Sequence, residues 1–319
     1  MRRERSVHGR NGCHRFHGTT SAYNRQMTRS AAGSNGAGRC APTKRRWQVL
    51  ALGLMSASHP GPGLTVTSLV VVFAAGVGLP FGQVVLLGAA VLTGQLSIGW
   101  SNDWIDAARD RSIGREDKPV AAGIVPVAGV GLAASAALGA TIVLSSLLGL
   151  RSAAALLVGI AAAWAYNLGL KATTWSGATY LLAFGALPVA PYAALPGQPW
   201  PPWWVPVVSA LLGFGAHVAN ALPDLRADAK TGVRGLPQRL GPQNGVIVMA
   251  AALVAASVVL ATAPQVAPTA FTATASSIGI VLAVVTAAFA VRFPHSPTAF
   301  RCTVVIAVLD VVVLLAVTN

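Results

Sequence analysis

Residues 81–110, FGQVVLLGAAVLTGQLSIGWSNDWIDAARD, join a long apolar run to an acidic end. The first twenty of them carry no charge, and a helix needs about 20 apolar residues to cross a bilayer. At about 100° per residue, Asp103, Asp106 and Asp110 fall within an arc of about 60°, which Asn102 extends. We therefore predict a membrane helix whose end presents a stack of carboxylates to one neighbour.

Similar apolar runs recur along the chain, which is 54% hydrophobic and only 10% charged. A soluble domain normally carries about 25% charged residues, so the composition favours a membrane protein. Nine segments bounded by glycine, proline or charge are predicted to cross the bilayer: 64–79, 81–106, 125–148, 152–170, 177–195, 203–222, 244–262, 271–291 and 303–317. We therefore expect an all-α membrane protein with nine transmembrane helices in a bundle.

The N-terminal segment 1–48 differs from the rest. It holds eleven of the 23 Lys and Arg residues, with Glu4 as its one acid, and shows no apolar periodicity. We predict a disordered basic cytoplasmic tail, followed by one transmembrane domain over residues 49–319. Because most of the formal charge of +14 lies in this tail, a nucleic-acid interpretation concerns the tail alone, and we expect no nucleic-acid partner.

The distribution of the remaining basic residues predicts the topology. With the tail inside, eleven Lys and Arg residues fall in inner loops and only Arg151 falls outside, as the positive-inside rule requires. The C-terminus then lies on the side opposite to the N-terminus. The uncharged outer loop 191–204 carries Trp200, Trp203 and Trp204, which suit an interfacial belt.

A second acidic cluster follows four membrane crossings later, and therefore on the same cytoplasmic side. Asn220, Asp224 and Asp228 recur every four residues and would span an arc of about 80° on a helix. With Glu116 and Asp117, which follow the first cluster closely, seven of the nine acidic residues lie in or beside these two clusters. Carboxylates near a bilayer repel one another, and oxygen ligands without cysteine or histidine favour Mg²⁺ over Zn²⁺. The neighbouring Lys and Arg residues are either topology determinants or ligands for a diphosphate.

Two pairs of segments resemble signatures of the UbiA superfamily of intramembrane prenyltransferases. Residues 102–110 (NDWIDAARD) and 115–124 (REDKPVAAGI) are similar to its first signature. Residues 220–228 (NALPDLRAD) and 232–241 (GVRGLPQRLG) are similar to its second. Tyr166 and Lys171 resemble a Tyr–Lys pair of the family, and the resemblance extends over about residues 50–319.

The resemblance implies a helical bundle around a central cavity, and transfer of an isoprenyl group from an isoprenyl diphosphate to a lipophilic, aromatic or quinone-type acceptor. It implies two Mg²⁺ ions, bound with the diphosphate by Asn102, Asp103, Asp106, Asp110, Asn220, Asp224 and Asp228. The implied diphosphate ligands are Arg115, Lys118, Lys171 and Arg234. The implied catalytic set is Asp106, Asp110, Asp224, Asp228, Tyr166 and Lys171.

The chain departs from the family pattern in two places. Many members carry Arg or Lys before a proline that begins the first helix, at a position thought to hold the acceptor. Here the stretch 58–62 reads SHPGP, which argues against an aromatic acid such as 4-hydroxybenzoate as acceptor. In addition, Arg115 is followed by Glu116 where proline is most common.

Two other functions are compatible with the same residues. A membrane terpene cyclase would keep both acidic clusters and need no acceptor. A cation transporter would use the clusters as a binding site, but transport sites lie near the bilayer midplane. Asp310 and His217 either line a substrate cavity or serve packing, and the sequence predicts no oligomeric state.

Overall fold

The computed structural model describes residues 43–225, 228, 232–263, 269–293, 296 and 298–318. Residues 48–319 form one unit, and the described part of it contains helices and loops but no strand. The chain up to residue 42 lies outside the described residues, so the disordered tail stays a prediction. The first helix of the described residues begins at Thr43, within the predicted tail.

Each of the nine predicted segments coincides with helical structure. The helices are α2 (Thr43–Ala57), α3 (Pro60–Gly76), α4 (Phe81–Ser112), α5 (Val127–Ser146), α6 (Leu150–Leu168), α7 (Ser176–Ala186), α8 (Val189–Ala194), α9 (Trp204–Ala221), α11 (Leu236–Thr262), α12 (Ala270–Arg292) and α13 (Thr298–Thr318). Two 3₁₀ turns, η1 (Leu170–Ala172) and η2 (Leu222–Asp224), follow α6 and α9. The predicted helix 177–195 is divided into α7 and α8, with Pro188 at the break, because proline lacks the N–H that a continuous helix needs.

Seven of the described helical segments are long and apolar enough to cross a membrane. They are α4, α5, the α7–α8 pair, α9 with η2, α11, α12 and the 298–316 part of α13. The apolar helix α3 has only 17 residues, and α6 is not among the seven. The number of nine transmembrane helices therefore stays a prediction. The central cavity also stays a prediction.

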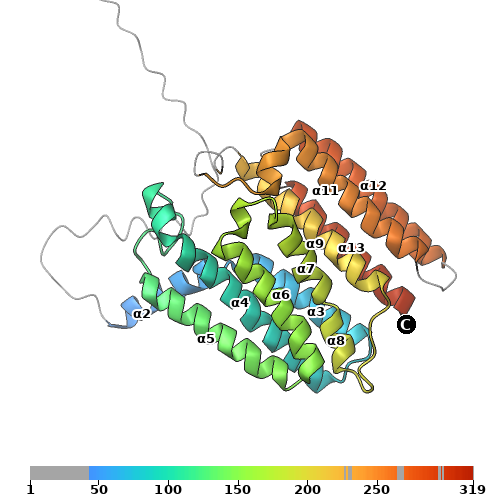
Figure 1. Ribbon diagram of the computed structural model, residues 1–319, viewed down its shortest axis with the longest axis horizontal. Helices are drawn as coiled ribbons and strands as arrows, with labels where there is room; N and C mark the ends of the chain where they lie inside the picture. The colour runs from blue at the N-terminus through green and yellow to red at the C-terminus, as the bar shows by residue number, and fades with distance from the viewer. Residues whose placement is uncertain are drawn as a thin grey trace, which may run out of the picture. The chain divides into compact units, whose positions relative to one another are not determined.

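Most helices contact their neighbours in the sequence, but the last helix, α13, also contacts α9 and α3. In Figure 1, α5, α4 and α6 lie on one side and α11 and α12 on the other, with α9 and α13 between them. The largest buried cluster joins α9, α11, α12 and α13 around side chains such as Val205, Leu253 and Ile306. The described helices thus form a bundle without a covering layer of polar helices, as expected for a bilayer solvent.

The end of α4 brings the first acidic cluster into the bundle. The helix continues to Ser112, beyond the apolar segment that was predicted to end at residue 106, because its carboxylates are paired with cations. Gly99, one turn before Asp103, permits the close approach of the α2–α3 turn. A Cβ atom at Gly99 would overlap the backbone carbonyl of Ser58.

Candidate active site

The centre of the first cluster is an ion pair between α4 and η1. The Nζ atom of Lys171 donates to both carboxylate oxygens of Asp106 at 2.6 Å. Arg109, one turn further along α4, donates to Oδ2 of Asp106 at 2.9 Å. The exposed fractions of the Asp106 and Lys171 side chains are only 8% and 12%, so this charge pair is largely removed from solvent.

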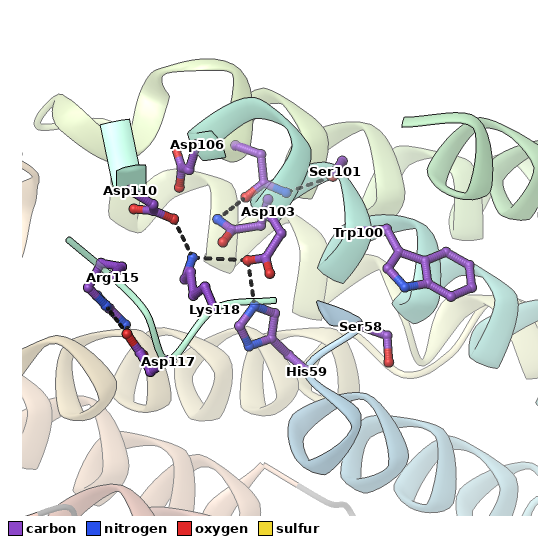
Figure 2. A network of polar contacts seen from close by, with 12 residues as sticks. Ser58, His59, Trp100, Ser101, Asp103, Asp106, Asp110, Arg115, Asp117 and Lys118 are labelled. Atoms are coloured by element: carbon purple, nitrogen blue, oxygen red, sulfur yellow. Dashed lines mark hydrogen bonds and ion pairs between the residues drawn. The ribbon is translucent and has the colours of Figure 1, made fainter. Parts of the chain in front are cut away.

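Lys118 joins the other two carboxylates of α4, as Figure 2 shows. Its Nζ lies 2.9 Å from Oδ1 of Asp103 and 2.8 Å from Oδ2 of Asp110. Burial alone would lower the pKa of Lys118, but its hydrogen bonds and the charges of Asp110 and Asp103 raise it. Three acids of α4 therefore lie against three cations, a neutral arrangement that lets this helix end stay buried.

His59 is a member of this network that the sequence did not reveal. It lies directly before Pro60 with φ 52°, a left-handed conformation that is uncommon for a residue other than glycine. Its Nε2 atom lies 3.1 Å from Oδ1 of Asp103. The stretch 58–62 was distinguished in the sequence only as a departure from the family pattern, and nothing there pointed to Asp103.

Asn102 faces α6 through a second residue that the sequence did not single out. Its Nδ2 donates to Oδ1 of Asn167 at 3.2 Å. Asn167 in turn donates to the backbone oxygen of Ile98 and to Oγ of Ser101 at 3.0 and 2.8 Å. This amide pair fixes α4 against α6 beside Lys171, and it leaves the metal-binding role of Asn102 a prediction.

Arg115, in the loop after α4, is influenced by the charges of both acidic clusters. It forms two hydrogen bonds with Asp117, Nε to Oδ1 at 2.8 Å and Nη2 to Oδ2 at 2.9 Å. The pKa of Arg115 is raised first by this bond and also by the charges of Asp110 and Asp224. A charge from each acidic cluster therefore acts on the same guanidinium.

The second cluster does not lie on one regular α-helix. The helix α9 ends at Ala221, and Leu222–Asp224 form the 3₁₀ turn η2 around Pro223. The predicted arc of Asn220, Asp224 and Asp228 assumed an uninterrupted α-helix and is therefore wrong at this turn. Proline causes the change because it has no N–H and its ring clashes with the preceding turn.

The side chains of the second cluster are more exposed than those of the first. Asn220, Asp224 and Arg234 are exposed. Asp228 accepts a hydrogen bond from Nε2 of Gln238 at 2.7 Å; burial and the charge of Asp224 raise its pKa, against the opposing charges of Arg109 and Arg115. Arg226 and Lys230, two basic residues next to the cluster, lie outside the described residues.

An aromatic group adjoins the ion pairs. Tyr166 at the end of α6 contacts the rings of Tyr180 and His217 edge-on at 5.3 and 5.7 Å. Tyr180 and His217 stack at 4.3 Å, and His217 lies 3.3 Å from Oγ of Ser176. The charges of Asp228 and Asp106 both act on Tyr166, which links the aromatic group to both acidic clusters.

Asp310 lies in α13, in a different part of the bundle. Its side chain is completely buried and accepts hydrogen bonds from Oγ of Ser257 in α11 at 3.3 and 3.4 Å. A Cβ atom at Gly279 in α12 would lie 3.3 Å from its Oδ1. This setting supports the packing interpretation of Asp310, where three helices meet.

The donor set fits Mg²⁺ shared with a phosphate rather than a metal held by protein alone. Among the described residues, no group of three His, Cys, Asp or Glu side chains could hold a metal ion. The carboxylates of α4 provide oxygen ligands only, and the buried Oδ2 of Asp103 has no hydrogen-bond partner in the described part of the chain. Mg²⁺ characteristically takes one or two carboxylates and completes its shell with water and substrate phosphate.

Comparison with known proteins places this geometry in a family. Residues 64–309 match the UbiA prenyltransferase family. The chain is 33% identical over 169 residues to the bacteriochlorophyll synthase 33 kDa chain of Cereibacter sphaeroides, a match that covers 50% of this chain and 55% of that relative. The chain thus spans about half the length of the curated relatives it matches.

Solved structures share the fold at low identity. A UbiA homolog from Archaeoglobus fulgidus bound to GPP and Mg²⁺ has a TM-score of 0.66 at 16% identity, covering 83% of this chain and 99% of that one. An apo UbiA homolog from Aeropyrum pernix K1 has a TM-score of 0.66 at 18% identity, covering 79% and 97%. With the seven apolar helices, these matches identify an integral, multi-pass membrane protein.

Proposed function

The chain belongs to the UbiA prenyltransferase family, and on that premise we propose that it is a magnesium-dependent intramembrane prenyltransferase. It moves an isoprenyl group from an isoprenyl diphosphate to a lipophilic acceptor of aromatic or quinone type. The observation that carries the proposal is the paired arrangement of Asp106 with Lys171 and of Asp110 with Lys118. Such a set can exchange its internal ion pairs for a metal-bound diphosphate.

The acids and the bases of this site have separate tasks. We assign metal binding to Asp106, Asp110, Asp224 and Asp228, supported by Asn102, Asp103 and Asn220, and diphosphate binding to Arg115, Lys118, Lys171 and Arg234. The homolog solved with GPP and Mg²⁺ supports a magnesium requirement, and we propose two ions. When bound, Mg²⁺ neutralises the charge that grows on the leaving diphosphate.

Binding of the donor requires a change of partners at α4. Lys171 and Lys118 now neutralise carboxylates, and phosphate oxygens would take over these lysine N–H donors. The freed carboxylate oxygens are then available for metal. Burial lowers the pKa of Lys171, although the bond to Asp106 opposes this, so a second anion helps to keep the ammonium charged.

The aromatic group protects the organic product of ionisation. The carbon–oxygen bond of the donor breaks, and the electron pair leaves with the diphosphate. The allylic cation that remains is attacked by the acceptor, which then loses a proton. Tyr166 faces this cation with its ring, an attraction of about 0.5–2 kcal/mol, while Tyr180 and His217 keep water from that side.

The two competing functions differ from a prenyltransferase in the substrates that they need. A terpene cyclase would use the same donor site without an acceptor, and a cation transporter would use the acids without a donor. Because one relative is a bacteriochlorophyll synthase chain, a chlorophyll-type macrocycle belongs in the acceptor panel beside quinone precursors and phenols. We also infer that both acidic clusters and the N-terminus are cytoplasmic, because the Lys and Arg residues gather on that side.

The test is product formation by purified protein in lipid. Geranylgeranyl, farnesyl and longer diphosphates are supplied with Mg²⁺, with and without each acceptor, and products are identified by mass spectrometry. A prenylated acceptor supports the transferase, and a hydrocarbon or terpene alcohol without acceptor supports the cyclase. Cation flux into liposomes without turnover of any donor supports the transporter and overturns the proposal.

A further inference from the structure

A second site lies at the other end of α6 from Lys171. Arg151 is the second residue of α6 and Lys171 follows its last turn, so the helical part from Arg151 to Leu168 alone spans roughly 26 Å at about 1.5 Å per residue. Beside Arg151, α6 and the α7–α8 pair enclose a groove of about 240 Å³. Its lining includes Arg151, Ala154 and Val158 of α6, Ala193 of α8, and Gln198 and Trp200.

The groove divides into an apolar channel and a polar end. The channel is formed by small aliphatic side chains, such as the exposed Ala154 and Val158 of α6. It can hold an alkyl chain without leaving a polar group unpaired. At its end, Gln198 and Trp200 belong to the loop before α9, where a tryptophan marks the level of the membrane interface.

Arg151 supplies the charge at that end. Its guanidinium lies 6.0 Å from the centre of the Trp200 ring, and Nη1 donates to the backbone oxygen of Gln198 at 3.3 Å. In the described part of the chain its other N–H groups have no protein acceptor. A guanidinium held over a ring, with donors left open, suits the two oxygens of a phosphate.

We propose that this groove binds an anionic phospholipid, with the phosphate on Arg151 and one acyl chain along the alanines of α6 and α8. The lipid comes from the leaflet opposite to the acidic clusters. On that side Arg151 is the single basic residue that the predicted topology provides. On that side a lipid phosphate has no basic residue other than Arg151 to bind, and its negative charge is complementary to the positive charge of Arg151. The site is independent of the proposed reaction, because its lining residues include none of the acidic clusters.

The test uses the full-length protein and a phosphatidylglycerol probe with a diazirine in its acyl chain. After irradiation, we expect labelled peptides from residues 151–158 and 186–200. Unlabelled phosphatidylglycerol should compete about fivefold to tenfold better than phosphatidylcholine, and Arg151→Gln should remove that preference. The matched control is Arg292→Gln, because Arg292 also lies over a ring, that of Phe293 at 5.6 Å, but outside the groove.

A second pair of variants tests the channel without the charge. Ala154→Phe fills the groove from an exposed position and should reduce labelling at least fivefold. Ala161→Phe, at another exposed position of the same helix that does not line the groove, should not. Equal labelling of all variants, or equal competition by both phospholipids, overturns the proposal. Competition by a long isoprenyl diphosphate alone would instead assign the groove to the donor chain and would also overturn it.

Discussion

Lys171 and Asp106 are 65 residues apart in the sequence, and the Lys171 Nζ lies 2.6 Å from both oxygens of the Asp106 carboxylate. One belongs to η1 after α6 and the other to the last turns of α4. This contact joins α4 to η1, the turn after α6, at the first acidic cluster. The same two side chains carry the proposed metal and diphosphate binding, so the site is held together by the groups that it uses.

Removal of one member of this pair should impair both stability and activity. Lys171→Ala leaves a nearly buried carboxylate without its main partner, and breaking such a pair costs about 3–5 kcal/mol. We expect a lower unfolding temperature in detergent and at least a hundredfold loss of pyrophosphate release. The double variant Lys171→Ala/Asp106→Ala should recover part of the stability but none of the activity. Equal unfolding temperatures for the single and double variants would contradict the pairing.

Magnesium should be required for turnover but not for folding. The acids of α4 are already neutralised by Lys118, Lys171 and Arg109, so the empty site has no unpaired stack of charge. Removal of the metal with a chelator should abolish donor ionisation and leave helicity and unfolding temperature within experimental error. Unfolding on chelation, measured by circular dichroism, would show instead that the metal holds the bundle together.

The left-handed backbone at His59 predicts an unusual order of substitutions. A β-branched residue is strongly disfavoured at φ 52°, whereas asparagine tolerates it and can still donate a hydrogen bond to Asp103. His59→Asn should therefore stay within about 1 kcal/mol of the parent, and His59→Val should lose about 2 kcal/mol or more. The measurement is equilibrium unfolding in mixed micelles, and a reversed order would remove His59 from the network.

Gly99 should be intolerant of a methyl group. Gly99→Ala places a Cβ on the Ser58 carbonyl, and such overpacking costs about 1–3 kcal/mol. It should also separate His59 from Asp103 and reduce activity. Gly82 lies in the same helix with no heavy atom within 4 Å of an added Cβ. Gly82→Ala is thus the control and should be neutral or stabilising by up to about 1 kcal/mol.

Much of the fold follows from patterns that are local in the sequence. Runs such as 244–262 and 271–291 predicted α11 and α12, because a bilayer helix satisfies its own backbone and needs only apolar length. The period of Asp103, Asp106 and Asp110 predicted their common face, which Lys118 and Lys171 now contact. The family resemblance, rather than spacing, brought Lys171 into the predicted site.

Other features depend on contacts that one sequence does not encode locally. The bond from His59 to Asp103 joins residues 44 apart, and the amide pair of Asn102 and Asn167 joins residues 65 apart. The end of α9 before η2 has a local cause, Pro223. The regular four-residue spacing of Asn220, Asp224 and Asp228 nevertheless predicted a continuous helix. The groove at Arg151 arises from three separate segments and has no sequence motif.

Magnesium-dependent cleavage of an isoprenyl diphosphate is best measured as pyrophosphate release by the protein in lipid, with and without Mg²⁺. The parent protein is compared with Asp106→Ala and Asp224→Ala, one variant from each acidic cluster, after all three are shown to be folded. We predict release that requires Mg²⁺ and falls by at least a hundredfold in both variants. Release without Mg²⁺, release by either variant at the parent's rate, or no release from any donor would contradict it.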